Sequence, residues 1–149
     1  MGVVVIPNPN YNQTITIYNC LKGVDNATGK DLWYKTLLEN CFYKSVLVLQ
    51  PVNNTTAKMV NAYTVRIPES DKYKSYSKWV KLPHEERVKY FTVRMDDLVI
   101  KGSSAEGITG ESPDTLAQVL TRNKPDAFKV SAFADNTLSA FGKHYRLGG

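Results

Sequence analysis

The sequence predicts a mainly β protein, because of its composition and a repeated two-residue alternation of apolar and polar residues. Its 149 residues include nine Tyr, five Phe and two Trp, and aromatic and β-branched side chains favour strands. Apolar residues make up 42% and charged residues 22% of the chain, which is ordinary for a folded domain. A chain of this length is expected to form a single domain with its own core.

The alternation is clearest in residues 91–102. Apolar and polar residues alternate from Phe91 to Met95, Asp96 and Asp97 follow, and an apolar run then resumes. Alternation with a period of two places every second side chain on one face, and Asp is common in turns. We therefore expect a hairpin here, with the two Asp residues in a solvated turn rather than acting as an acid–base pair.

Four more strands are expected before this hairpin. Their residues are 14–21, 31–40, 41–50 and 58–68. The first three are expected to form an antiparallel meander, and the ambiguous period of residues 31–40 indicates a bend or bulge. The apolar run 46–49 is expected to be buried on both faces of its strand.

Residues 1–13 are expected to form an N-terminal arm that precedes a single domain of residues 14–149. Pro7 and Pro9 each remove a backbone donor and interrupt any strand in this segment. The arm either reaches a neighbouring subunit or frays as an ordinary terminus.

Residues 69–89 form a long insert in which aromatic residues lie between lysines. Such a pattern can stack single-stranded nucleic acid, but it also suits a loop that docks on its own domain, and no nucleic-acid module accompanies it. A single helical turn is expected after Pro83. The candidate residues for contact with a partner or DNA are Lys72, Lys74, Lys78 and Trp79.

A Gly- and Ser-rich loop, residues 102–111, follows the central hairpin and is expected to be flexible. It matches no phosphate-binding motif, so we interpret it as a loop that faces a channel or a partner. Its candidate residues are Ser103, Ser104, Glu106 and Thr109. A helix is expected over residues 112–122, with Ser112 as N-cap and Pro113 in the first turn. Two strands, residues 127–135 and 138–147, complete the domain.

No catalytic, metal or cofactor site is expected. Cys20 and Cys41 have no CxxC spacing and are predicted to be two free buried thiols. His84 and His144 lack the neighbouring ligands that a metal needs, and no Ser or Cys is placed near either His with an orienting carboxylate. The chain is therefore not expected to be an enzyme.

The net charge of +5 arises from 19 Lys and Arg against 14 Asp and Glu. An excess of this sign can favour nucleic acid, but the lysines are scattered, as on an ordinary soluble surface. Neither a signal peptide nor a membrane span is expected, because the apolar run 3–6 is too short.

Several segments in order resemble a family of small proteins encoded in the head and tail-connection modules of tailed phages and prophages. They are ITIYN, DLWYKTLLENCFY, YTVRIP, KYFTVRMDDLVIKG, DAFKV, DNTL and KHYRLGG. The resemblance covers nearly the whole chain from Thr14. In size and β-rich layout the chain is also similar to the head-closure, or stopper, proteins of phage necks, which are small β-barrels.

This resemblance implies a small antiparallel β-barrel or sandwich with one or two short helices and long loops. It also implies a homo-oligomeric ring, sixfold or twelvefold, that closes the DNA-filled head and docks the tail. The implied partners are portal-adaptor proteins, tail proteins and double-stranded DNA in the channel, with no membrane. The protein would be made in the host bacterial cytoplasm and end in the virion, and the family has no catalytic residues to transfer.

Two alternatives stay open. The insert 69–89 and the helix 112–122 are additions to the simplest stopper pattern, which leaves room for a tail-completion or tail-terminator protein. A nonspecific nucleic-acid-binding module would instead need the lysines of residues 72–81 on one face, and its binding would depend strongly on salt.

Overall fold

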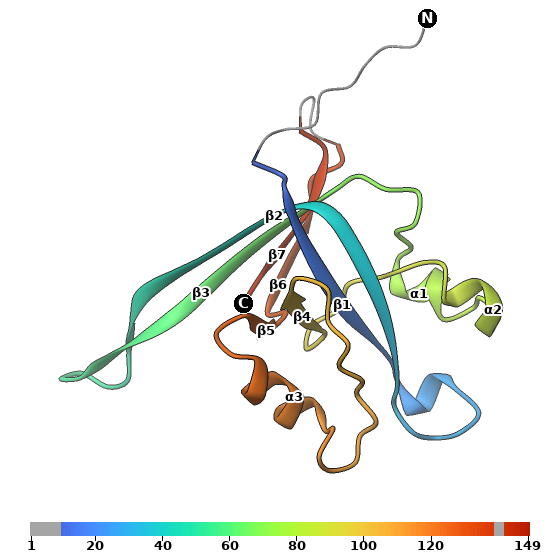
Figure 1. Ribbon diagram of the computed structural model, residues 1–149, viewed down its shortest axis with the longest axis horizontal. Helices are drawn as coiled ribbons and strands as arrows, with labels where there is room; N and C mark the ends of the chain where they lie inside the picture. Colours follow the sequence, from blue (N-terminus) through green and yellow to red (C-terminus); the bar gives the residue numbers. More distant parts are fainter. Residues whose placement is uncertain (1–9, 139–141) are drawn as a thin grey trace, which may run out of the picture.

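The computed structural model describes residues 10–138 and 142–149, which form a curled seven-stranded antiparallel sheet with three short helices (Figure 1). The expectation of a mainly β, barrel-like fold is confirmed, since the sheet forms a half-barrel. The strands are β1 (Gln13–Leu21), β2 (Leu32–Pro51), β3 (Ala57–Pro68), β4 (Leu98–Lys101), β5 (Ala127–Lys129), β6 (Ala132–Asp135) and β7 (His144–Gly148). The helices are α1 (Tyr76–Trp79), α2 (His84–Arg87) and α3 (Leu116–Asn123), and a 3-10 turn, η1, spans Gly23–Asp25.

The strand order is β5-β4-β1-β2-β3-β7-β6. Its two outermost strands, β5 and β6, are consecutive in the chain, so the linker between them joins the two ends of the sheet. In that linker the Val130 amide donates to the Asp97 carbonyl at 2.8 Å, and the Ser131 amide donates to the Gly148 carbonyl at 2.8 Å. The chain connection therefore closes the curl of the sheet.

Strand β2 organises the fold because it belongs to both halves of the sheet. Residues Leu32 to Cys41 pair with β1, and residues Phe42 to Pro51 pair with β3. The change of partner coincides with a register shift and with Asn40, whose φ of 58° lies in the left-handed region that Asn tolerates. The expected bend is thus confirmed, although one long strand replaces the two that were predicted.

The buried residues form two clusters on opposite faces of β1. Ile15 and Ile17 contribute to the larger cluster inside the curl, and Tyr18 contributes to a smaller one beneath α3. The alternation predicted for residues 14–21 is therefore confirmed, since the two sets of side chains enter different clusters. Val119 of α3 and Ile108 of the preceding loop complete the smaller cluster.

The central hairpin predicted for residues 91–102 is wrong. Only β4 is a strand, and it pairs with β1 and β5 rather than with residues 91–95. Phe91 instead makes an isolated parallel bridge to Tyr73 of the insert. The prediction that both Asp residues lie in a solvated turn is wrong in part, because Asp97 is 1% exposed. The single buried face is wrong as well, because Thr92 is 1% exposed whereas Met95 is 51% exposed.

The prediction that residues 46–49 are buried on both faces is also wrong. These residues lie in the outer part of the β2–β3 hairpin, which projects from the body of the domain (Figure 1). Leu47 is 63% exposed and Leu49 is 69% exposed, and the two valines beside them are about two-fifths exposed.

Two predicted boundaries also differ from the structure. Helix α3 begins at Leu116 rather than at Ser112, because Thr115 is its N-cap and forms a capping box with Gln118. The last strand begins at His144, and part of the predicted strand 138–147 lies outside the described residues. Most of the predicted N-terminal arm, residues 1–9, also lies outside them.

Candidate functional site

The loop of residues 102–111 lies along β1 and is held there by hydrogen bonds. The Thr16 hydroxyl donates to the Gly102 carbonyl at 2.8 Å and accepts from the Ser104 amide at 3.0 Å. The Tyr18 hydroxyl donates to the Glu106 carbonyl at 2.7 Å and lies 3.0 Å from the Ser104 hydroxyl oxygen. Ser104 is thus engaged within the domain, whereas Ser103 and Thr109 are exposed.

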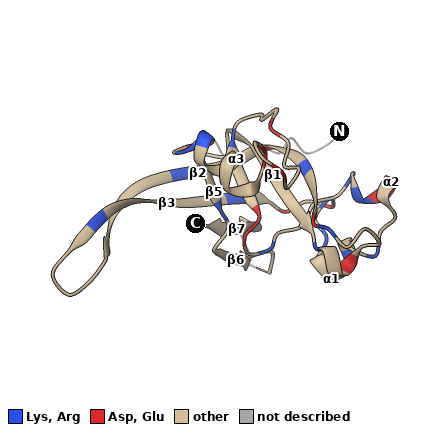
Figure 2. Ribbon diagram, turned by 90° about the horizontal axis from the view of Figure 1, so that it is seen from below, with Lys and Arg blue, Asp and Glu red and all other residues tan. Residues whose placement is uncertain are grey.

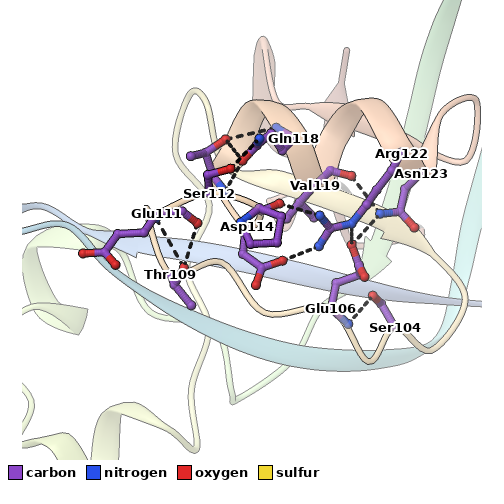
Figure 3. A network of polar contacts seen from close by, with 12 residues as sticks. Ser104, Glu106, Thr109, Glu111, Ser112, Asp114, Gln118, Val119, Arg122 and Asn123 are labelled. Atoms are coloured by element: carbon purple, nitrogen blue, oxygen red, sulfur yellow. Dashed lines mark hydrogen bonds and ion pairs between the residues drawn. The ribbon is translucent and has the colours of Figure 1, made fainter.

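The far end of this loop is joined to α3 by the polar network shown in Figure 3. The Glu106 carboxylate accepts from Arg122 Nε at 2.6 Å and from Asn123 Nδ2 at 3.0 Å. Arg122 also donates to Asp114 Oδ1 at 2.5 Å. The hydrogen bond from Arg122 holds the pKa of Glu106 below its usual value. The Glu106 side chain therefore serves to fix the loop against α3.

We predict that Tyr18→Phe loosens this loop without disturbing the core. The substitution keeps the ring and removes a hydroxyl that is buried between Ser104 and Glu106. We expect the free energy of unfolding to fall by about 1 kcal/mol, the usual net value of a hydrogen bond. Hydrogen exchange should become faster at the amides of residues 104–106.

Tyr90→Phe is the matched control, because the Tyr90 hydroxyl makes no hydrogen bond with any residue that the structure describes. Unchanged exchange in Tyr18→Phe would mean that the Tyr18 hydroxyl does not hold the loop.

The insert of residues 69–89 docks on the domain through its aromatic side chains. Trp79 is fully buried and lies edge-on to Tyr34 of β2, with 5.3 Å between ring centroids. Tyr73 lies 4.3 Å from the Tyr145 ring of β7. A fully buried ring cannot stack on a nucleic-acid base. The structure therefore does not support the prediction that Trp79 faces a partner. Interleaved aromatics here indicate docking of the loop.

Arg87 of α2 connects the two short helices of this insert. Its guanidinium donates to the Trp79 carbonyl at 3.3 Å, to the Val80 carbonyl at 3.0 Å and to the Leu82 carbonyl. It also donates to the Tyr34 hydroxyl at 3.0 Å. These bonds tie α2 to the last residue of α1 and to the turn that follows it, where the Trp79 carbonyl also accepts from the Leu82 amide at 3.2 Å.

The three lysines predicted for partner contact have different surroundings. Lys72 and Lys78 are exposed. Lys74 is half-buried, with its ammonium group 5.0 Å from the centre of the Tyr90 ring. Lys72 and Lys78 therefore remain available to a partner, whereas Lys74 already contacts an aromatic ring of its own chain.

A buried carboxylate that the sequence did not identify lies behind β1. Asp97 accepts hydrogen bonds from Asn19 Nδ2 at 2.9 Å, the Arg94 amide at 2.9 Å and the Cys20 amide at 3.3 Å. Asn19 also exchanges two hydrogen bonds with the backbone of Thr92. Burial raises the pKa of Asp97 to about 6 despite these donors. Asn19 and Asp97 together therefore join β1 to the irregular segment that precedes β4.

The outer part of the β2–β3 hairpin, residues 44–62, carries several exposed apolar side chains, and we call it the hairpin arm. These side chains are Val46, Leu47, Val48, Leu49, Val52 and Met59. In this antiparallel pair, opposed residues share a face. Val46 and Val48 lie opposite Ala62 and Val60 on one face. Leu47 and Leu49 lie opposite Asn61 and Met59 on the other. Apolar side chains thus cover both faces of a two-stranded ribbon.

A groove of about 910 Å³ lies where β2 and β3 diverge, and we call it the fork groove. Buried Leu38 and Ile67 form its floor, and Leu37 and Val88 are about half exposed at its rim. Along this groove the first half of β2 pairs only with β1. The opposite edge of β2, residues 35–40, therefore pairs with no other strand in the described part of the chain.

A model for a family of unknown function, DUF6751, matches residues 10–149. The chain belongs to this family. No curated protein and no solved structure matches it.

In this DUF6751 member, both cysteines are free and buried, as predicted. Burial raises the pKa of Cys20 to about 11 and that of Cys41 to about 12, so both remain thiols at neutral pH. Within residues 10–138 and 142–149, His, Cys, Asp and Glu side chains form no group of three that could hold a metal ion. None of the helices in that part of the chain is long and apolar enough to cross a bilayer.

Proposed function

We propose that this DUF6751 protein is a structural subunit of a tailed-phage virion neck. In this role it forms a homo-oligomeric ring at the head–tail interface, closes the DNA-filled head and provides the docking surface for the tail. The ring binds portal-adaptor proteins on one side and tail proteins on the other, and double-stranded DNA passes through its channel. The protein is made in the host bacterial cytoplasm and acts in the virion, without enzymatic activity.

The observation that best supports an assembly role is the hairpin arm. A soluble monomer rarely exposes a contiguous apolar surface of this kind, and Leu47, Leu49 and Met59 are each more than half exposed. The half-barrel also agrees with the small β-barrel expected from the resemblance to head-closure proteins. Residues 102–111 have no moving part in this role, because Ser104 and Glu106 are bonded to β1 and α3.

A tail-completion or tail-terminator role is the main alternative. The insert and α3 are integral parts of the fold, since Trp79 and Val119 are fully buried. These additions distinguish the chain from the simplest stopper layout and offer further surface for tail proteins.

Electron microscopy of lysates from a phage with this gene deleted separates these roles. Head closure predicts tailless heads that have lost their DNA beside normal free tails. Filled heads beside abnormal tails would transfer the role to the tail end, and normal virions would exclude any structural role in the neck.

A nonspecific nucleic-acid-binding module is the second alternative, supported by the exposed Lys72 and Lys78. It predicts DNA binding whose affinity falls steeply with salt and is reduced when both lysines are replaced by Ala. Binding that is absent at low salt would remove this alternative.

A further inference from the structure

The hairpin arm has features of a surface that another protein covers. A two-stranded ribbon is marginally stable in water when it stands alone, and this one carries Val46 and Val48 on one face and Leu47 and Leu49 on the other. Burying such side chains on one face would still leave the other in water. A groove that receives the ribbon between two walls would cover both faces.

Both edges of the arm are open. Among the described residues, β2 beyond Phe42 pairs with β3 alone, and the outer edge of β3 bonds with the C-terminal segment only from Tyr63 onward. Alternate backbone N–H and C=O groups along both strands therefore point outward without a ladder partner. Open edges of this kind pair readily with a strand of another chain.

The tip of the arm is ordered by its own side chains. The Asn53 side-chain oxygen accepts from the Thr55 and Thr56 amides at 2.9 and 2.8 Å, and the Val52 amide donates to the Thr56 carbonyl at 3.0 Å. A closed tip keeps the two strands in register far from the body, so the arm is presented as a preformed element with a low entropic cost of binding.

We propose that the hairpin arm of one copy of this chain inserts into the fork groove of a second copy. The groove offers apolar side chains at its rim and floor, Leu37, Leu38, Ile67 and Val88, and an open edge of β2 at residues 35–40. An arm strand that pairs with this edge gains backbone hydrogen bonds, while its leucines and valines contact the groove.

The groove must belong to another copy, because the arm points away from its own. The groove is bordered by Val88 and Lys89, which directly follow α2, and the arm and α2 extend from opposite sides of the domain (Figure 1). A contact between two different surfaces of identical chains is head-to-tail, and such contacts close into rings when the rotation permits. The inference rests on the proposed ring and names the surface that builds it.

The size of the arm is near that of the smallest specific contacts. Seven residues per strand at about 3.3 Å each and a ribbon about 10 Å wide give two faces of roughly 450 Å² together. Counting an equal area on the groove, one arm buries about 900 Å² in total, which is close to the roughly 1,000 Å² of the smallest specific interfaces.

Protein suits the arm better than DNA does. Between residues 40 and 68 the chain has no acidic residue and only Lys44, Lys58 and Arg66 as cations (Figure 2). DNA binding relies mainly on neutralised phosphates, whereas the exposed side chains here are chiefly apolar.

Cross-linking between single-cysteine additions tests the contact directly. We expect Leu49→Cys and Val88→Cys proteins, purified separately and then mixed under mild oxidation, to form disulfide-linked heterodimers. Cys20 and Cys41 are buried and do not compete. The matched control replaces Val88→Cys with Val24→Cys, because Val24 is 93% exposed and lies outside the groove. Equal linking in the control mixture would overturn the inference.

Light scattering across a concentration series supplies the second measurement. We expect the wild type to self-associate and the Leu47→Ser/Leu49→Ser variant to associate at least about tenfold more weakly, as for the loss of buried anchors, with an unchanged melting temperature. Val24→Ser should behave as the wild type.

The outcomes separate the inference from the proposed ring. Undiminished association of the double leucine variant would overturn the arm contact and leave the ring intact. A wild type that stays monomeric and forms no cross-links would overturn both. Intact association together with DNA binding that is lost in Lys44→Ala/Lys58→Ala would make the arm a nucleic-acid element, which also overturns the inference.

Discussion

Asp97→Ala is expected to destabilise the domain by about 3 kcal/mol in mildly acidic solution, because it removes the acceptor shared by three buried donors. Asn19 Nδ2, the Cys20 amide and the Arg94 amide all donate to this carboxyl group. A buried donor left without an acceptor costs about 1–3 kcal/mol. Two of the three donors have no other acceptor among the described residues, whereas Asn19 keeps the Thr92 carbonyl. Chemical denaturation of the variant and the wild type measures the difference.

The contribution of Asp97 should depend on pH in a defined direction. Burial raises the pKa of Asp97 from 3.8 to about 6 on folding, so the folded state holds the proton more tightly than the unfolded state. The stabilisation is therefore complete below about pH 4 and is lost as the pH rises through 6. A difference of two pKa units corresponds to about 2–3 kcal/mol, so the cost of Asp97→Ala should be smaller at neutral pH.

Asp97→Asn is the control for this titration, because it occupies the same space without an ionisable group. The stability of the wild type minus that of Asp97→Asn should fall between pH 4 and 7. A flat difference would show that burial does not perturb this carboxyl group.

The sequence predicted the parts of the fold in which one strand meets two different environments. In β1, Ile15 and Ile17 enter one cluster and Tyr18 the other, so alternation was visible without knowledge of the neighbours. The bend near Asn40 was predictable for the related reason that the period of the pattern breaks where β2 changes its partner.

The central hairpin failed because the alternation of residues 91–95 does not come from a strand with one buried face. Phe91 and Val93 are buried, but Thr92 is buried too and Met95 is 51% exposed. The neighbours of this segment are the insert and Asn19 of β1. Asn19 and Asp97 are 78 positions apart in the chain, and nothing local in the sequence connects them. A buried Asp beside an exposed one, Asp96, has the same local signature as a solvated turn.

The hairpin arm was misread for a different reason. Four successive apolar residues, 46–49, indicate that both faces of a strand are buried. The same pattern is expected whether the residues that bury these faces belong to the same chain or to another chain. A single sequence contains no sign of which applies. The structure removes the first possibility, since the arm projects from the domain (Figure 2).

Trp79→Ala is expected to have the largest effect of any single substitution in the insert. The indole is fully buried against Tyr34 and Tyr76, with the Arg87 guanidinium 5.6 Å from the ring centre. Truncating a buried Trp costs about 3–5 kcal/mol. We also expect faster hydrogen exchange across α1 and α2, because the carbonyls that Arg87 bonds are positioned by this ring.

Two further variants separate packing from the other roles of Trp79. The indole Nε1 has no hydrogen-bond partner in the described part of the chain, so Trp79→Phe should lose only volume and cost less than half as much as Trp79→Ala. Lys78→Ala, at the exposed neighbouring position, should leave stability within about 0.5 kcal/mol of the wild type. If Trp79→Ala instead preserved stability and weakened DNA binding, the ring would have to leave its pocket to stack on bases. The insert would then be a nucleic-acid contact, because a side chain that is released without cost is not part of the core.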